Sequence, residues 1–172
     1  WTQPFNDELA AAPVATADRV LLATAEGDVV ALRAGDGVEV WRRRLKRAAT
    51  SRPAATATHA FVATADDQVV SLDLSTGTVL WTQRLGGAGH DIVADGARLF
   101  LGARDRAFYC LNADNGDVEW RWPGGADSVG AAAVDEKSVY VVSLDNVLRG
   151  LNRSSGVQRS EEHTSELQSR FG

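Results

Sequence analysis

The sequence has few cysteines, few prolines and no long apolar run, and each shortage excludes a class of protein. One cysteine among 172 residues excludes an internal disulfide and any metal site built from several cysteines. No stretch approaches the roughly 18 uninterrupted apolar residues of a transmembrane helix. The start, Trp1-Thr2-Gln3-Pro4, lacks the basic and then apolar segment of a signal peptide. With 44% hydrophobic residues, 16 glycines and 4 prolines, the composition is that of a globular chain.

Basic residues are also in the minority, with 18 against 23 acidic residues and a net charge of −5. A nucleic-acid-binding protein must neutralise phosphates, so we expect no nucleic-acid partner. No glycine-rich phosphate loop opens a helix, and no Ser-His-Asp arrangement is present. His59 and His90 fall in different parts of the chain's repeats and form no ligand spacing. We therefore expect no catalytic residue, no cofactor-binding residue and no metal ligand.

Four of the five tryptophans recur with a period of about 40 residues, at Trp1, Trp41, Trp81 and Trp120. A glycine stands four residues before each of the last three, at Gly37, Gly77 and Gly116. A fourth glycine, Gly156, continues the step and predicts a tryptophan at position 160. Because Trp1 is in phase with the repeat, we expect the sequence to begin inside the last strand of an earlier repeat.

Each repeat contains short runs of β-forming residues separated by polar turns. The first run of each repeat is weak and lies at 14–16, 54–56, 92–94 and 131–134. The second run is strong and lies at 20–24, 60–64, 99–103 and 139–143. The third run, also strong, lies at 29–32, 69–72, 108–111 and 148–151. A turn ending in glycine follows, and a fourth run carries the tryptophan. Four antiparallel strands per 40 residues are typical of a β-propeller blade, whereas helical repeats need amphipathic helices that find no room here. We predict an all-β domain over 1–158, with blades at about 12–45, 53–85, 91–122 and 129–158 and the last strand truncated.

Residues 159–172 do not follow the period of the preceding chain. Arg159–Ser169 resembles a commonly used DNA sequencing adapter translated in one frame; the alternative is a charged helical tail. We exclude 159–172 from the fold as a non-native, disordered tail, although Arg159 itself fits either side of the boundary. His163 falls in this segment.

Two columns stand side by side near the end of the third strand of each repeat. One column is leucine, at Leu32, Leu72, Leu111 and Leu151, and its neighbour is small, at Ala31, Ser71, Cys110 and Gly150. We expect the leucines to face the adjoining blade, and the small residues to permit close approach near the axis of the ring. Cys110 is then a buried, unreactive thiol.

Charged residues form two further patterns. An acidic column, Glu26, Asp66, Asp105 and Asp145, falls in equivalent turns and emerges on one face. Turn formation is the preferred interpretation of these carboxylates, and a cation site is the alternative. The basic run Arg42-Arg43-Arg44, with Lys46 and Arg47, follows a tryptophan on an outer strand. We interpret it as a solvated sheet edge, with a partner contact as the alternative.

The string Leu72-Asp-Leu-Ser-Thr-Gly-Thr-Val-Leu-Trp81 and its counterparts at 32–41 and 111–120 resemble the repeat of the pyrroloquinoline-quinone-like (PQQ-like) β-propeller family. The resemblance implies that Trp41, Trp81 and Trp120 dock each blade on its neighbour, with Gly37, Gly77 and Gly116 in the turns. It also implies that the four blades are part of a ring of seven or eight, completed by further blades of the same chain.

The family contains both quinone-dependent dehydrogenases and cofactor-free scaffolds such as the outer-membrane barrel assembly lipoprotein. The dehydrogenases carry adjacent cysteines and long loops, whereas Cys110 is solitary and the loops here are short. The resemblance therefore implies a non-catalytic scaffold with a protein partner, in an extracytoplasmic, periplasmic and lipid-anchored setting, with a role in outer-membrane protein assembly. A fragment of a quinone-dependent alcohol or sugar dehydrogenase and an extracellular sensor domain remain the alternatives.

Overall fold

The computed structural model describes residues 1–128 and 130–159, which form four successive antiparallel sheets. Blade 1 contains β1 (Val14–Ala15), β2 (Arg19–Ala23), β3 (Asp28–Arg33) and β4 (Glu39–Arg44). Blade 2 contains β5 (Ala54–Ala55), β6 (His59–Thr64), β7 (Gln68–Asp73) and β8 (Val79–Arg84). Blade 3 contains β9 (Val93–Asp95), β10 (Arg98–Gly102), β11 (Ala107–Asn112) and β12 (Val118–Pro123). Blade 4 contains β13 (Ala133–Val134), β14 (Ser138–Val142) and β15 (Leu148–Asn152).

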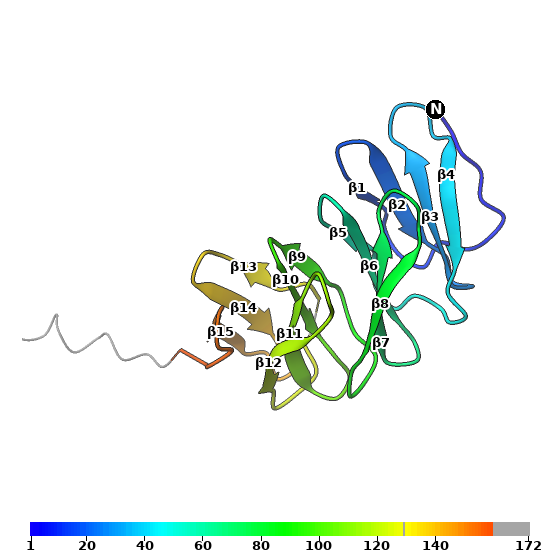
Figure 1. Cartoon of the computed structure of the whole chain (residues 1–172). Coiled ribbons are helices and arrows are strands. Elements are labelled where there is room, and N and C mark those ends of the chain that lie inside the picture. The colour runs from blue at the N-terminus through cyan, green and yellow to red at the C-terminus, as the bar shows by residue number, and fades with distance from the viewer. Residues whose placement is uncertain (129, 160–172) are drawn as a thin grey trace, which may run out of the picture.

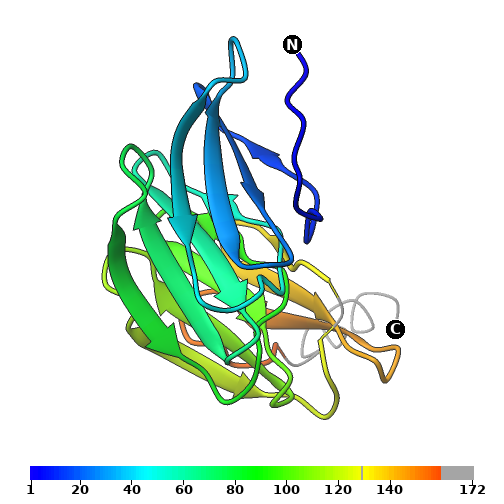
Figure 2. The same ribbon diagram turned by 90° about the vertical axis from the view of Figure 1, so that its right-hand side faces the viewer.

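Strands follow chain order within every sheet, so each blade is a simple up-and-down meander. The blades stand side by side as a fan, with the short strands β1, β5, β9 and β13 along its inner side (Figure 1). A quarter turn shows the sheets stacked face against face (Figure 2). The predicted all-β partial propeller is therefore confirmed, and the described residues contain no helix long or apolar enough to cross a membrane.

The middle strands are apolar because both of their faces are covered. All four residues from Val29 to Leu32 are buried, as are their counterparts in β7 and β11. A strand in a one-sided sheet would alternate apolar and polar residues, whereas a strand buried on both faces reads as a continuous apolar run. This explains why the third-strand segments stood out in the sequence while the short inner strands did not.

The core lies between blades rather than inside them. Leu21 and Val29 of blade 1 pack in one cluster with Val62 and Leu72 of blade 2. Equivalent clusters join blades 2 and 3 and blades 3 and 4, and each contains the leucine of the later blade, Leu111 or Leu151. The expectation that this leucine column faces the adjoining blade is confirmed.

The expectation that the small-residue column lies near the axis is wrong. These residues are on the third strand of each sheet and pair across it with the tryptophans, as Ala31 with Trp41, Ser71 with Trp81 and Cys110 with Trp120. Alanines of the inner strands occupy the axial side instead. Ala15, Ala55 and Ala94 line a shared hollow of about 620 Å³. The small side chains beside the tryptophans leave room for the next blade to approach.

Blade 4 has three named strands and the beginning of a fourth. Leu151 and Gln158 form an isolated antiparallel bridge, and the Arg159 N–H donates to the Gly150 carbonyl at 2.9 Å. The Arg159 guanidinium also donates to Ser138 Oγ at 2.6 Å, so this residue is part of the blade. The remainder of the adapter-like segment, with position 160 and His163, lies outside the described residues.

Polar side chains close the turn between the third and fourth strands. Asp73 Oδ1 accepts from Ser75 Oγ at 2.6 Å and from the Thr76 N–H at 2.8 Å. The side-chain oxygens of Asn112 and Asn152 accept equivalent backbone N–H groups in blades 3 and 4. The hydrogen bonds from Ser75 and then Thr76 lower the pKa of Asp73 to about 2.

Asp73→Asn should remove one source of acid sensitivity while keeping the turn, because asparagine serves at this position in blades 3 and 4. The pKa of Asp73 is depressed in the folded state, so the carboxylate stabilises the fold above about pH 4 and this contribution is lost as the pH falls toward 2. Urea midpoints measured between pH 5 and pH 2 should depend less on pH for D73N than for the wild type. The reciprocal Asn112→Asp variant should gain acid sensitivity; equal pH dependence in all three proteins would contradict this account.

Leu111→Ala should lower the free energy of unfolding by about 2–5 kcal/mol, because it opens a cavity in the core between blades 2 and 3. Val118→Ala, at an exposed position of β12, is the control and should change stability by about 0.5 kcal/mol or less. Urea unfolding followed by circular dichroism provides both values. Similar losses for the two variants would argue against an inter-blade core.

Candidate functional site

Each blade is joined to the next by an indole hydrogen bond. Trp41 Nε1 donates to the Leu74 carbonyl at 2.9 Å, and Trp81 Nε1 donates to the Ala113 carbonyl at 3.0 Å. The same bond joins Trp120 to the Arg153 carbonyl at 3.0 Å and Trp1 to the Ala34 carbonyl at 3.0 Å. We call each tryptophan, with the turn that it contacts, a clamp.

The face of each indole covers the glycine of the next blade's turn. A Cβ added to Gly77 would lie 2.5 Å from Cε3 of Trp41, and one added to Gly116 would lie 2.6 Å from Cε3 of Trp81. Gly37 meets Trp1, and Gly156 meets Trp120, in the same way. These glycines also have φ between +69° and +79°, where a Cβ is costly. Sequence reasoning did not find the contact between indole and glycine, although the constant offset between each tryptophan and the next repeat's glycine was a signal for it.

These hydrogen bonds matter for stability because most of the indole rings are buried. Trp41 and Trp120 are each 8% exposed, Trp81 is half-buried and Trp1 is 60% exposed. A buried indole N–H without an acceptor would lose its hydration with no replacement, so the carbonyl contact is needed as well as the apolar one. Trp81 and Trp120 add tilted aromatic contacts to Phe61 and Phe100, at 5.9 and 6.0 Å between ring centroids. The clamps lie at separate junctions along the fan.

Cys110 lies between blades 3 and 4 and is fully buried. Burial first, and then the carboxylate of Glu119, raise the pKa of its thiol to about 12. A thiol with this pKa holds its proton at neutral pH and is a poor nucleophile.

The acidic column is engaged in local hydrogen bonds. Asp105 accepts from the Tyr109 hydroxyl at 2.5 Å and from Arg121 at 3.0 Å. Burial raises its pKa, but the hydrogen bonds from Tyr109, Arg121 and the Ala107 N–H, together with the charge of Arg121, lower the pKa overall. Asp145 is held by Arg149 at 2.6 Å in the same type of turn. No three metal-ligating side chains lie together among residues 1–128 and 130–159.

The basic run at the end of blade 1 divides into two parts. Arg42 pairs with Asp28 at 3.1 Å and Glu39 at 2.9 Å within its own blade, and with Asp7 of the preceding segment at 3.7 Å. Arg43 instead donates to the Gly77 carbonyl of blade 2 at 2.6 Å, so it reinforces the clamp of Trp41. Sequence reasoning did not find this contact, because the spacing of the run does not reveal which arginine faces the next blade.

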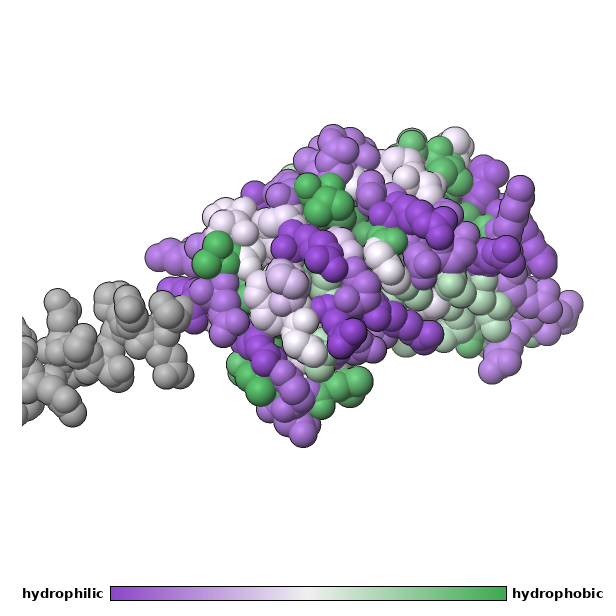
Figure 3. Space-filling model, turned by 90° about the horizontal axis from the view of Figure 1, so that it is seen from below, coloured by the Kyte–Doolittle hydropathy of each residue, from purple (hydrophilic) through white to green (hydrophobic). Residues whose placement is uncertain are grey.

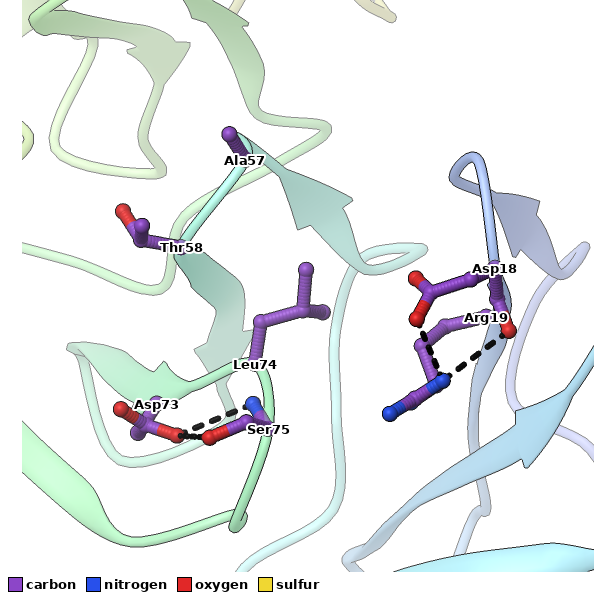
Figure 4. A pocket seen from close by; sticks show the side chains of 7 residues that line it. All are labelled: Asp18, Arg19, Ala57, Thr58, Asp73, Leu74 and Ser75. Carbon is purple, nitrogen blue, oxygen red and sulfur yellow. Dashed lines mark hydrogen bonds and ion pairs between the residues drawn. The ribbon is translucent and has the colours of Figure 1, made fainter.

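Two grooves flank the junction of blades 1 and 2, at opposite ends of the strands. The first, of about 190 Å³, is polar: Asp18 and Arg19 of blade 1 face Asp73 and Ser75 of blade 2 (Figure 4). Most of its charged groups are engaged within each blade, because Arg19 binds Asp18 at 2.6 Å and Ser75 donates to Asp73 at 2.6 Å, although the buried Nε of Arg19 has no hydrogen-bond partner among the described residues. The first groove therefore offers few free groups to a ligand.

The second groove has about 370 Å³ and a different lining. Leu45, Val70 and Val79 supply apolar surface, while Lys46 and Arg47 are exposed beside them. We call these five residues the basic groove. An apolar surface with cations at its margin fits an extended segment that carries both apolar and acidic side chains.

Gly77→Ala should destabilise the fold more than Gly96→Ala. Both glycines have positive φ, +69° and +61°, but a Cβ at Gly96 would meet nothing within 4 Å, whereas one at Gly77 would collide with Trp41. The Gly96 variant isolates the cost of the backbone conformation, about 1–2 kcal/mol. The Gly77 variant should lose about 1–3 kcal/mol more in urea unfolding, because the indole is displaced. Equal losses would show that the indole contact contributes nothing.

Comparison with known proteins agrees with this geometry. A family model described as outer membrane protein assembly factor BamB matches residues 1–88 and 75–169. The structure of BamB from Moraxella catarrhalis superposes with a TM-score of 0.79 at 16% identity, over 88% of this chain and 48% of that chain. The computationally designed protein Ika8 gives 0.81 at 17% identity, over 89% and 48%, and the designed Ika4 gives 0.79 at 14%, over 87% and 94%.

The chain thus spans about half the length of the BamB structure that it matches. The search of curated proteins gave no match. The low identities to solved structures establish the fold alone, whereas the family model matches both halves of the sequence. Together with the four repeating clamps, this match shows that the chain belongs to the PQQ-like β-propeller repeat family of the outer membrane protein assembly factor BamB.

Proposed function

We propose that the chain is part of a non-catalytic propeller that acts as a protein-binding scaffold in outer-membrane protein assembly. The family match supports this role, since its model is described as an assembly factor. The observation that carries the proposal is the basic groove, which apolar and cationic side chains line at the junction of blades 1 and 2. With this role we also propose a periplasmic, lipid-anchored parent protein, by analogy with the family.

The clamps explain how such a scaffold would work. Trp41 and Arg43 fix blade 2 against blade 1, so the two sides of the basic groove keep their separation before any partner arrives. A preorganised surface loses little conformational entropy on binding, and more of the contact energy appears as affinity. Hydrophilic residues cover most of the face seen in Figure 3, and hydrophobic residues form separate patches on it. A surface of this kind suits selective docking better than broad hydrophobic association.

The cations of the basic groove set the expected chemistry of the partner. Arg44 and Asp66 also line the groove, but Arg44 pairs with Glu26 at 3.4 Å and Asp66 accepts hydrogen bonds from Thr64 and Gln68. Among the described residues, Lys46 and Arg47 are therefore the lining cations without an ion pair. Two exposed cations contribute mainly orientation and salt-dependent attraction. The apolar residues Leu45 and Val79 would contribute the remaining binding free energy through contact with aliphatic side chains of the partner.

A direct test uses a fluorescein-labelled peptide of alternating leucine and glutamate, with a leucine–lysine peptide for comparison. The glutamate peptide should bind more tightly, and the double variant Lys46→Glu/Arg47→Glu should weaken it about tenfold or more at low salt, which corresponds to about 1.4 kcal/mol. Arg52→Glu, an exposed charge reversal beside the inner strands, is the control and should change the affinity little. Equal binding of both peptides, or equal effects of the groove and control variants, would contradict the proposal.

A further inference from the structure

Asn115 is the only asparagine in the sequence that is followed by a glycine. A residue with a side chain follows each of the others, which are Asn6, Asn112, Asn146 and Asn152. An asparagine loses its side-chain amide when the backbone nitrogen of the next residue attacks Cγ, which makes it a thermally labile residue. Glycine hinders this attack least, because it has no side chain. The sequence thus places one reactive pair, Asn115 and Gly116, in the turn between β11 and β12.

The folded turn holds both reacting groups in other hydrogen bonds. The Gly116 N–H donates to the Asn112 carbonyl at 2.9 Å. Asn115 Oδ1 accepts from the Asp117 N–H at 3.0 Å, and Asn115 Nδ2 donates to the Asp117 carboxylate at 2.7 Å. The Gly116 nitrogen must lose its proton and turn toward Cγ before it can attack, so the closed turn opposes the reaction.

The clamp of Trp81 keeps this turn closed. Trp81 Nε1 donates to the Ala113 carbonyl at 3.0 Å, within the same turn, and the indole ring covers Gly116. Gly116 is buried under this ring, whereas Asn115 is exposed to water. The reaction therefore requires the turn to separate from the indole, and water reaches the side chain of Asn115 without any further opening.

We propose that Asn115 is a site of spontaneous covalent modification and that opening of the Trp81 clamp sets its rate. Hydroxide removes the proton of the Gly116 N–H, and the nitrogen forms a bond to Cγ of Asn115. The bond from Cγ to Nδ2 breaks, and Nδ2 takes a proton from water and leaves as ammonia. Water then hydrolyses the resulting cyclic imide at one of its two carbonyl carbons, which restores the Gly116 N–H.

The two hydrolysis products differ in their effect on the clamp. Cleavage between Cγ and the Gly116 nitrogen gives aspartate, which the same turn of blade 1 already carries as Asp36 before Gly37. Cleavage between the backbone carbonyl carbon of residue 115 and that nitrogen gives isoaspartate, whose main chain runs through Cβ and Cγ and is longer. Isoaspartate displaces Gly116 from the indole of Trp81, so the junction of blades 2 and 3 loses its clamp. The inference rests on the clamp geometry and not on the proposed scaffold function.

The test is the rate of deamidation at Asn115, measured by peptide mass spectrometry during incubation of the full chain at pH 8 and 37 °C. The native chain should react at least about tenfold more slowly than the chain unfolded in urea. Trp81→Ala should speed the reaction of the native chain about fivefold or more, because the turn opens more often. Trp41→Ala is the matched control: it removes the clamp between blades 1 and 2 and should change the rate at Asn115 less than about twofold.

Circular dichroism establishes that each variant is folded. If either alanine variant is unfolded, Trp81→Phe and Trp41→Phe replace the pair, because phenylalanine keeps an aromatic ring but lacks the N–H donor. Trp81→Phe should then speed the reaction at Asn115, and Trp41→Phe should not. Equal rates in the native and unfolded chains, or equal acceleration by the Trp81 and Trp41 variants, would overturn the proposal.

The stability of the products tests the consequence for the clamp. The isoaspartate form, separated from the aspartate form after incubation, should unfold at a lower urea concentration than the wild type. Asn115→Asp carries the other product and should unfold close to the wild type. Asn115→Thr, with the residue that blade 2 has at Thr76, should resist the modification and keep its urea midpoint. Equal midpoints for the isoaspartate and aspartate forms would contradict the predicted loss of the clamp.

Discussion

The hydrogen bond and stacking contact of an indole with the next blade is the interaction on which the rest of the structure depends. A single sheet of about 40 residues cannot bury both of its faces, so each blade is stable only against its neighbours. The clamps of Trp41, Trp81 and Trp120 fix each neighbour at one distance and one angle, through a polar contact to a carbonyl and an apolar contact to a glycine. The leucine clusters then fill the space that the clamps define.

Much of this arrangement could be predicted from the sequence, because each repeat meets the same physical requirement with the same residue types at equivalent positions. The recurrence of Trp41 and Gly77 predicted the blades, and the column of Leu72 predicted the core between them. The position of the small column could not be predicted, because Ala31 and Ser71 have no property that distinguishes closeness to the axis from closeness to an indole. Only the strand pairing shows that they lie opposite the tryptophans.

The candidate binding surface was harder to predict than the fold. Sequence spacing identifies the basic run, but the paired Arg42 and the groove-lining Arg47 differ only in which carboxylates the fold brings near them. Arg43, which reaches the Gly77 carbonyl, links the run to the clamp and so to the spacing of the blades. Binding surface and clamp are therefore parts of one junction, and a change in blade spacing would alter the groove.

Hydrogen exchange of the indole N–H groups, followed by NMR, tests most directly whether the clamps hold the blades together. If they do, the indole protons of Trp41, Trp81 and Trp120 should exchange only with cooperative opening of the blades, at the rate of the backbone amides of β7 and β11. The proton of the more exposed Trp1 should exchange sooner. Rapid exchange of the three indole protons while those amides stay protected would show that the blades hold together without the clamps.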